Sequence, residues 1–503
     1  MPALLLLCSG YAIPTLRILW TSLQHVTFLK QSNARFAGLD NYMALDNVFG
    51  AGTLMTFGVG LASAVIAIVG GGAVAYLAHR SGRSGRRAVQ IAYAVPMASL
   101  ASAAIATAWL HTFARRPVNA FPDALDPGYA IVALLVSFGL LTGLGATAYL
   151  LVLRAGGPPR RLVPAGVLVA VVLAAGAVAV TLQSFVLPNM LLRKADSTPA
   201  IGMYNAGFRY GDLGLASAAG VVLLAVLAVL GVIVTAVVVL LRARIVRVEE
   251  PGPAKPSGAW LAATAVVGGG ALLIGVLGLL PWLGGLADFG RLPGGWFTPI
   301  LFTWGPTLVS TVVGVGAAVL AGYGIGALRP FGDRSALLLL PFAPWLFVGL
   351  VPLMTDAYMH LWDGDDNVAK AFLRAIPPSS LSIPALFLSA VLFRGLASQY
   401  GPSQALRRAA PVVGLIALVT WVVQAQDPLW SLVVTRDRDY ASMPSLALNQ
   451  MFQYAVGPET LVGWVLPVPG FLLLAAAIAA VQVFSIDKLA LRVGADDTPQ
   501  PPA

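Results

Sequence analysis

The feature that most constrains this chain is a series of apolar stretches, each about twenty residues long and almost free of charge. An α-helix needs about twenty apolar residues to cross the hydrocarbon core of a bilayer. Reading the chain with this length predicts about twelve membrane-spanning helices, near residues 2–20, 52–78, 88–113, 130–153, 162–186, 214–241, 259–283, 305–328, 336–361, 381–396, 411–434 and 460–485. We therefore expect an all-α, polytopic membrane protein.

The composition excludes a soluble enzyme. Hydrophobic residues make up 58% of the chain and charged residues only 10%, whereas a typical soluble domain has about 25% charged residues. The single cysteine, Cys8, excludes a disulfide framework, and the four histidines have no metal-ligand spacing. No phosphate-binding loop of the form G-x-x-x-x-G-K-[ST] is present, so the chain is not itself an ATPase. We predict no catalytic residues, no cofactor and no metal.

The basic residues predict the orientation in the membrane. They cluster after alternate spans, at 80–87, 154–161, 242–255, 329–334 and 407–408, while the opposite loops are mixed or acidic. Cytoplasmic loops are enriched in Lys and Arg, so we expect both termini in the cytoplasm. Arg115 and Arg116 lie on the other side and count against the rule. We attribute the net charge of +10 to these loops and expect no nucleic-acid partner.

The chain divides into two halves with similar patterns. A Pro- and Gly-rich linker at 249–258 separates residues 1–248 from residues 259–493, and residues 494–503 form a polar tail that we expect to be disordered. In each half a Thr-Leu pair opens a Gly- and Ala-rich helix, and the next span contains a proline, Pro96 or Pro341. Polar or Pro-containing stretches end spans 162–186 and 411–434 and predict breaks there.

Several short motifs resemble a known family. Phe36–Tyr42 reads F-A-G-L-D-N-Y, and Ser197–Ala218 contains an S-T…Y…A-F…G-L-A-S-A pattern. In the second half, Thr307–Gly324, Asp427–Val434 and Met443–Leu446 carry further matches in the same order. Together they resemble the permease subunits of sugar-type ABC importers, with two permeases fused in tandem.

This resemblance implies a function. It implies a multi-pass protein of the bacterial inner membrane that moves a carbohydrate or a similar polar solute between its two halves. An extracytoplasmic solute-binding protein would deliver the solute, and a separate ATP-binding cassette subunit would hydrolyse ATP.

The loops that couple such permeases to the ATPase depart from the family pattern. Family members carry an E-A-A…D-G…L-P loop whose short helix docks on the ATPase. Here loop 154–161 has two prolines and two glycines, which disfavour a helix. Loop 403–410 can form about two helical turns but has no acidic residue. We predict that any ATPase contact is made mainly by the second half, through Arg407 and Arg408.

Polar groups beside the predicted helix breaks are candidates for a solute path. Their amides and carboxylate can hydrogen-bond a polyol, and an aromatic face can stack on a sugar ring; the alternative is that they lie near the outer interface and contact water. These residues are Gln183, Asn189, Gln424, Gln426, Asp427 and Trp430. We interpret Trp109, His111, Asp356, His360 and Trp362 as interfacial groups.

Three alternatives to an ordinary ABC permease stay open. The length and span number also fit a secondary carrier of the major-facilitator type, although the outer-loop motifs do not. The missing coupling loops favour a degenerate permease that acts as a non-transporting membrane scaffold or receptor partner. A divergent permease that drives its ATPase through shorter loops is the third.

Overall fold

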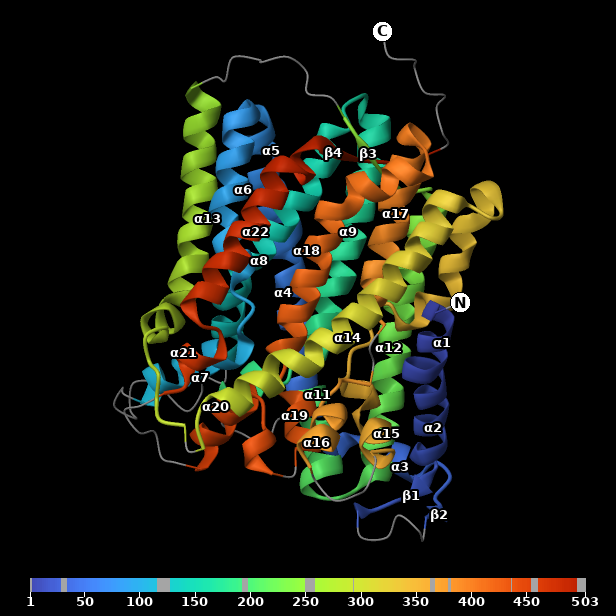
Figure 1. The fold of residues 1–503 in the computed structure, drawn as a ribbon, viewed down its shortest axis with the longest axis vertical. Coiled ribbons are helices and arrows are strands. Elements are labelled where there is room, and N and C mark those ends of the chain that lie inside the picture. Colours follow the sequence, from blue (N-terminus) through green and yellow to red (C-terminus); the bar gives the residue numbers. More distant parts are fainter. Residues whose placement is uncertain are drawn as a thin grey trace.

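The computed structural model shows a tall bundle of helices with two short two-stranded sheets (Figure 1). It describes residues 2–28, 34–114, 127–191, 198–248, 258–292, 294–361, 367–378, 381–435, 437–453 and 460–494. Most of the predicted linker and the predicted disordered tail therefore lie outside the described residues, as do Arg115, Arg116 and Trp362.

Among the described residues, the first half contains twelve α-helices and ends in a strand. Its main elements are α1 (Pro2–Leu7), α2 (Ile13–Ser22), β1 (Gln24–His25), β2 (Arg35–Phe36), α3 (Asp40–Met43), α4 (Ala51–Val65), α5 (Gly71–Arg80), α6 (Gly82–Ala98), α7 (Ser102–Ala114), α8 (Pro127–Arg154), α9 (Pro159–Leu182), α10 (Val186–Leu191), α11 (Pro199–Tyr204), α12 (Leu213–Leu240) and β3 (Arg244–Arg247). Short π-helical turns join α1 to α2 and α4 to α5, so each pair is one continuous helix.

The second half follows the same order. Its elements are α13 (Gly258–Gly285), α14 (Phe297–Tyr323), the 3₁₀ helices η8 (Gly332–Trp345) and η9 (Val351–Leu353), α15 (Met354–Met359), α16 (Val368–Arg374), α17 (Ile383–Tyr400), α18 (Pro402–Ala425), α19 (Leu429–Val434), α20 (Met443–Gln453), α21 (Val462–Val465), α22 (Val468–Phe484), η11 (Ile486–Lys488) and β4 (Leu489–Arg492).

The multi-pass, all-helical character is as predicted, but the number of spans differs. The described residues contain ten helices that are long and apolar enough to cross a membrane, or eleven if α6 and α7 form one span bent by 76°. The prediction of a helix over 336–361 is wrong. The segment contains three prolines close together, Pro341, Pro344 and Pro352, and it forms two 3₁₀ helices followed by the six-residue α-helix α15.

The predicted breaks in two other spans are confirmed. Helix α9 ends at Leu182 and α10 begins at Val186, while α18 ends at Ala425 and α19 begins at Leu429. In both halves, therefore, a helix of 24 residues is followed by a three-residue break and a helix of six residues. The residue that follows the long helix is a glutamine in both cases, Gln183 and Gln426.

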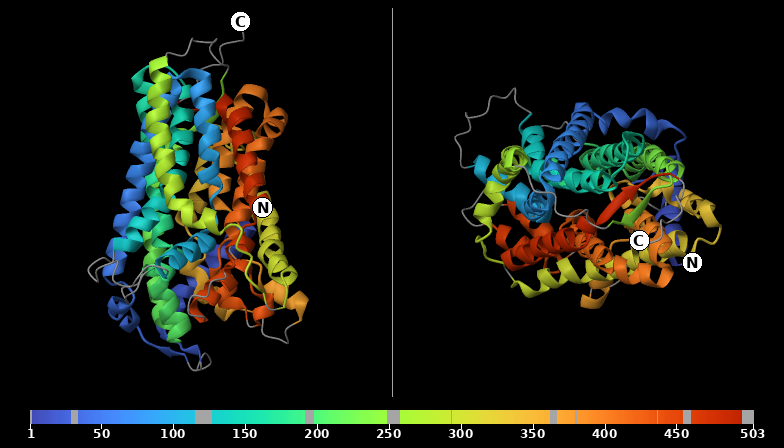
Figure 2. Two further views of the ribbon diagram at one scale, coloured as in Figure 1. Left: turned by 90° about the vertical axis from the view of Figure 1, so that its left-hand side faces the viewer. Right: turned by 90° about the horizontal axis from the view of Figure 1, so that it is seen from above.

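The two halves exchange contacts at their Pro-containing segments. The last long helix of the first half, α12, packs along η8 of the second, and α22 of the second half packs along α6 of the first. Gly231 of α12 lies directly against the carbonyl of Ala343 in η8, where a side chain has no room. Seen from above, the two halves lie mostly side by side (Figure 2).

A β-ribbon joins the ends of the two halves. Strand β3 follows α12 and strand β4 follows α22, and the two pair antiparallel with Val246 opposite Ala490. Strand β3 packs on α17 of the second half, while β4 packs on α8 and α9 of the first. The ribbon lies at the upper end of the bundle in Figure 1, together with the α5–α6, α8–α9 and α17–α18 connections that carry the basic residues. We call this the basic end and the other the outer end.

Candidate functional site

The break after α9 is fixed by a clamp between the two halves. Gln183 donates from Nε2 to the carbonyl of Phe347 at 2.8 Å, and its Oε1 accepts from the N–H of Gly349 at 2.7 Å. Residues 346–350 follow η8 and connect it to η9, so their backbone groups lack regular helical partners. Both ends of the Gln183 amide are therefore used by backbone groups of the opposite half.

The break after α18 has a related arrangement. Gln426 is 1% exposed; its Nε2 donates to the carbonyl of Val465 at 3.0 Å, while its backbone carbonyl accepts from Ser102 Oγ at 3.5 Å. Ser102 begins α7, directly after the bend at residues 99–101. Both glutamines thus contact the other half, Gln183 through its side-chain amide and Gln426 only through its backbone carbonyl. Among the described residues, Oε1 of Gln426 has no hydrogen-bond partner.

The other predicted path residues are placed separately. Gln424 accepts at Oε1 from Thr311 Oγ1 of α14 at 3.3 Å, and Asp427 accepts at Oδ1 from the N–H of Leu429, the first residue of α19, at 3.0 Å. Asn189 is half-buried in α10. Of the six residues, only Trp430 lines the cavity described next. The sequence located the two helix breaks but did not place their polar groups in one cavity.

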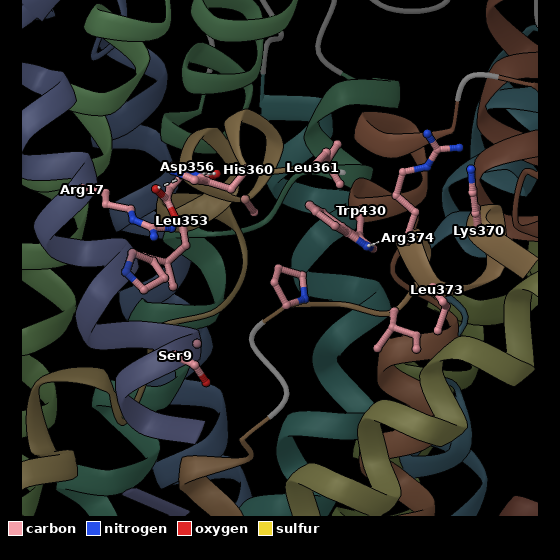
Figure 3. Close-up of a pocket in the computed structure, with 15 residues that line it drawn as sticks. Ser9, Arg17, Leu353, Asp356, His360, Leu361, Lys370, Leu373, Arg374 and Trp430 are labelled. Atoms are coloured by element: carbon pink, nitrogen blue, oxygen red, sulfur yellow. Dashed lines mark hydrogen bonds and ion pairs between the residues drawn. The ribbon is translucent and has the colours of Figure 1, made fainter. Parts of the chain in front are cut away.

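A cavity of about 330 Å³ opens near the outer end of the bundle (Figure 3). It lies between the N-terminal helix of the first half and the segments around α15, α16 and α19 of the second. We call it the outer cavity. Its described lining residues are Ser9, Gly10, Pro14, Arg17, Leu353, Asp356, Ala357, His360, Leu361, Lys370, Leu373, Arg374, Ile376, Pro378 and Trp430.

A buried carboxylate lies on one wall of the outer cavity. Asp356 is 3% exposed, with His360 Nδ1 at 3.1 Å from Oδ1 and Arg17 Nη1 at 4.0 Å from Oδ2. Burial raises the pKa of Asp356 above its ordinary value, although the neighbouring His360 and Arg17 act to lower it. The same imidazole nitrogen lies 2.9 Å from the backbone carbonyl of Asp356.

Asp356, which the sequence indicates as an interfacial group, is buried at the contact between the halves. The sequence signal for this buried carboxylate was Arg17, a cation within the first apolar stretch. A cation in a membrane span requires a partner, or solvent near the end of the span. The helix of Arg17 is held to the second half by two further bonds. Tyr11 Oη donates to the carbonyl of Leu381 at 2.9 Å, and Trp345 Nε1 donates to Thr15 Oγ1 at 3.1 Å.

The opposite wall carries the aromatic ring of Trp430 and two cations of α16. Trp430 Nε1 donates to the carbonyl of Arg374 at 3.1 Å, which fixes the indole against α16. Figure 3 shows Arg17 and Asp356 facing this wall across the opening. The cavity thus combines an aromatic surface, several hydrogen-bond donors and a buried carboxylate, which suits a small polar ligand.

The connections at the basic end are short. Only residues 155–158 separate α8 from α9, and Gly156 and Gly157 take positive φ angles there. Gly401 alone separates α17 from α18, so segment 403–410 is helical but continuous with the long helix. Arg407 and Arg408 are exposed on this first part of α18, and the Arg408 guanidinium lies 3.6 Å from the centre of the Tyr400 ring.

A buried charge cluster ties the halves together at the basic end. Asp487, between α22 and β4, accepts at Oδ1 from Arg86 Nε of α6 at 3.1 Å and from Arg154 Nη1 of α8 at 3.0 Å. The three side chains are only 3%, 11% and 5% exposed, respectively. We call this cluster the Asp487 clasp. Because the carboxylate belongs to the second half and both guanidiniums to the first, the clasp resists separation of the halves.

Comparisons with protein-family models and with curated proteins find no match to this chain.

Proposed function

We propose that this chain is the membrane-spanning part of an importer, in which a polar solute crosses between the two halves. The observation that carries the proposal is the repeated helix break. Each half breaks its 24-residue helix at a glutamine, and each of these glutamines makes a hydrogen bond with a residue of the opposite half. Interrupted helices in corresponding positions of two repeats are the arrangement that many transporters use at their solute sites.

The two ends of the interface between the halves differ, and this difference supports a direction for the proposed solute path. The outer cavity lies between the halves near the outer end, whereas the Asp487 clasp and the β3–β4 ribbon hold the halves together at the basic end. With the basic end in the cytoplasm, this arrangement corresponds to a path closed on the cytoplasmic side. Passage of a solute then requires the clasp and the ribbon to separate.

The resemblance to sugar-type ABC permeases supplies the proposed class. In that class the solute is a carbohydrate or similar polyol brought by an extracytoplasmic binding protein, and a separate ATP-binding cassette subunit drives transport in the bacterial inner membrane. The short α8–α9 and α17–α18 connections require that such an ATPase contact the chain differently. The exposed Arg407 and Arg408 of α18 are the contact that we propose.

Co-purification tests the partner. The chain, purified in mild detergent from its native membranes, should bring down an ATP-binding cassette subunit in a salt-sensitive complex, because exposed arginines bind acidic surfaces mainly through screened charge. Arg407→Glu/Arg408→Glu should lose the complex, while Arg291→Glu at the outer end keeps it. A complex that survives the double substitution, at every salt concentration, contradicts the proposed contact.

Uptake of labelled carbohydrates into cells tests the path. Gln426→Leu/Asp427→Leu should abolish uptake while the protein still inserts, because both groups lie at the α18–α19 break. Gln404→Leu, on the exposed first turn of the same helix, is the matched control. Full uptake in the double variant contradicts a path at this break.

One observation favours a second candidate, a proton-coupled secondary carrier. Asp356 is a buried carboxylate with a histidine beside it in the outer cavity, and a buried ionisable pair of this kind can bind and release a proton. Uptake that persists without any ATPase and stops when a protonophore collapses the proton gradient favours this candidate. A chain that binds partners but moves no solute under either condition is a scaffold.

A further inference from the structure

Two buried amides lie in the interface between the halves, one on each side. Helix α6 of the first half packs along α22 of the second; Gln90 of α6 is 3% exposed and Gln482 of α22 is 1% exposed. Nε2 of Gln482 lies 3.1 Å from Sδ of Met97 in α6 and 3.4 Å from Oγ1 of Thr147 in α8. Both contacts cross to the first half. We call the region of these four residues the inner seam.

Helical spacing places Gln90 on the face of α6 that meets the second half. Arg86, Gln90 and Met97 follow one another at separations of four and seven residues, and such residues share one face of an α-helix. Arg86 donates to Asp487 and Met97 contacts Gln482, so this face is turned towards the segment from α22 to η11. Gln90 therefore lies between these two contacts, about 6 Å along the helix axis from Arg86.

The oxygen atoms of both amides are left without a partner. Oε1 of Gln90 and Oε1 of Gln482 are buried and make no hydrogen bond with any residue that the structure describes. The same holds for Oε1 of Gln426, whose amide nitrogen bonds Val465 just before the outer end of α22. Buried acceptors are nearly always paired in folded proteins, because an unpaired one loses the hydrogen bonds that water gave it. The interface thus offers uncharged acceptors at both ends of α22.

The fold by itself does not require an amide at position 482. Gln482 is the one polar side chain of α22, which is otherwise built from apolar residues, glycine and proline. A methionine of similar size would fill the same space and leave no acceptor unpaired. Polar groups inside membrane spans are costly and mark solute or ion pathways. Because these acceptors carry no charge, they suit a solute that brings hydroxyl donors and no charge.

We propose that the inner seam is the inner part of the solute path, where Gln90 and Gln482 accept hydrogen bonds from the hydroxyl groups of an uncharged polyol. This inference rests on the proposed function and adds a binding place beyond the two helix breaks. Gln426 lies at the outer end of α22, and the Asp487 clasp follows the inner end of the same helix. The clasp holds the seam closed until the halves separate.

Thiol labelling in inside-out membrane vesicles tests access to the inner seam. In a Cys8→Ser background, Gln482→Cys should react with a small, membrane-impermeant thiosulfonate at least tenfold faster than Ser389→Cys. Ser389 is the matched control because it is fully buried but lies between α17 and α14 of one half. Equal rates for the two cysteines overturn the proposal, because a seam that opens must admit the reagent.

Protection from labelling tests the class of solute. Glucose, maltose or sorbitol should slow the labelling of Gln482→Cys at least twofold. Fully O-methylated glucose keeps the ring but has no hydroxyl donors, so it should not protect. Adding Gln90→Met should abolish the protection, because the second acceptor is then lost as well. If none of the three solutes protects, or if O-methylated glucose protects as well as glucose, the proposal is overturned.

Stability separates a path residue from a structural one. Gln482→Met should unfold at the same or a higher denaturant concentration than the wild type, while its uptake of labelled sugar falls at least tenfold; Ser389→Ala should keep full uptake. A clear loss of stability in Gln482→Met shows that the amide serves the fold and contradicts the proposal. Undiminished uptake in Gln482→Met also overturns the inner seam but leaves the proposed transport function standing. Sugar protection without uptake by the wild type retains the binding site and contradicts the transport function.

Discussion

Removal of the carboxylate of the Asp487 clasp should destabilise the protein strongly. Asp487 is 3% exposed and accepts from two guanidiniums at 3.0 and 3.1 Å. Asp487→Leu leaves Arg86 and Arg154 buried without this charge, and breaking a buried ion pair in this way costs about 3–5 kcal/mol. The three charges bridge the two halves, so the loss should appear in global unfolding.

Replacing the whole clasp with apolar side chains should restore most of this stability. The triple variant Arg86→Met/Arg154→Met/Asp487→Leu removes the desolvation penalty together with the attraction, and such replacements are often neutral or stabilising. Asp333→Leu is the control, because Asp333 is an exposed acid in the first turn of η8 at the same end of the bundle, and an exposed charge contributes about 1 kcal/mol or less.

Equilibrium unfolding in mixed detergent micelles, followed by helical circular dichroism, measures these differences. The expected order of stability is wild type and the Asp333 control highest, the triple variant close to them, and Asp487→Leu lowest. If Asp487→Leu unfolds with the same free energy as the wild type, the clasp does not hold the halves together. A triple variant that is less stable than Asp487→Leu also refutes the reasoning.

Three further outcomes follow from the structure. Gly231→Val should destabilise the packing of α12 on η8 by about 1–3 kcal/mol or displace η8, measured by the same unfolding assay, because the added methyl groups meet a backbone carbonyl. Burial raises the pKa of Asp356, so the folded state becomes more favourable as pH falls and the carboxylate takes up a proton. Asp356→Asn lacks this ionisable group. The variant should therefore lose its stability advantage over the wild type towards acid pH, measured as the difference between their unfolding free energies. With the native cysteine removed, a cysteine at Ser84 should resist a membrane-impermeant thiol reagent in intact cells and one at Arg35 should react; the reverse result inverts the topology.

The sequence by itself determined the class of fold and most of the helices. Apolar length and scarce charge force backbone groups in a bilayer to bond within helices, so the hydropathy pattern predicts spans well. Polar and proline residues after α9 and α18 also predicted both helix breaks. Hydropathy failed at 336–361, where the segment is apolar enough for a span but contains three prolines close together and forms 3₁₀ helices in place of one long α-helix.

Only the tertiary structure decided which polar groups meet. Gln183 and Gln426 occupy equivalent positions in the sequence pattern, yet both amide atoms of Gln183 bond the opposite half, whereas the side chain of Gln426 donates to its own half. Arg17 and Asp356 are 339 positions apart and become neighbours only because the N-terminal helix packs on the second half. Hydropathy reports the transfer of each segment into lipid and carries no information on which helices associate, because their lipid-facing surfaces are equally apolar.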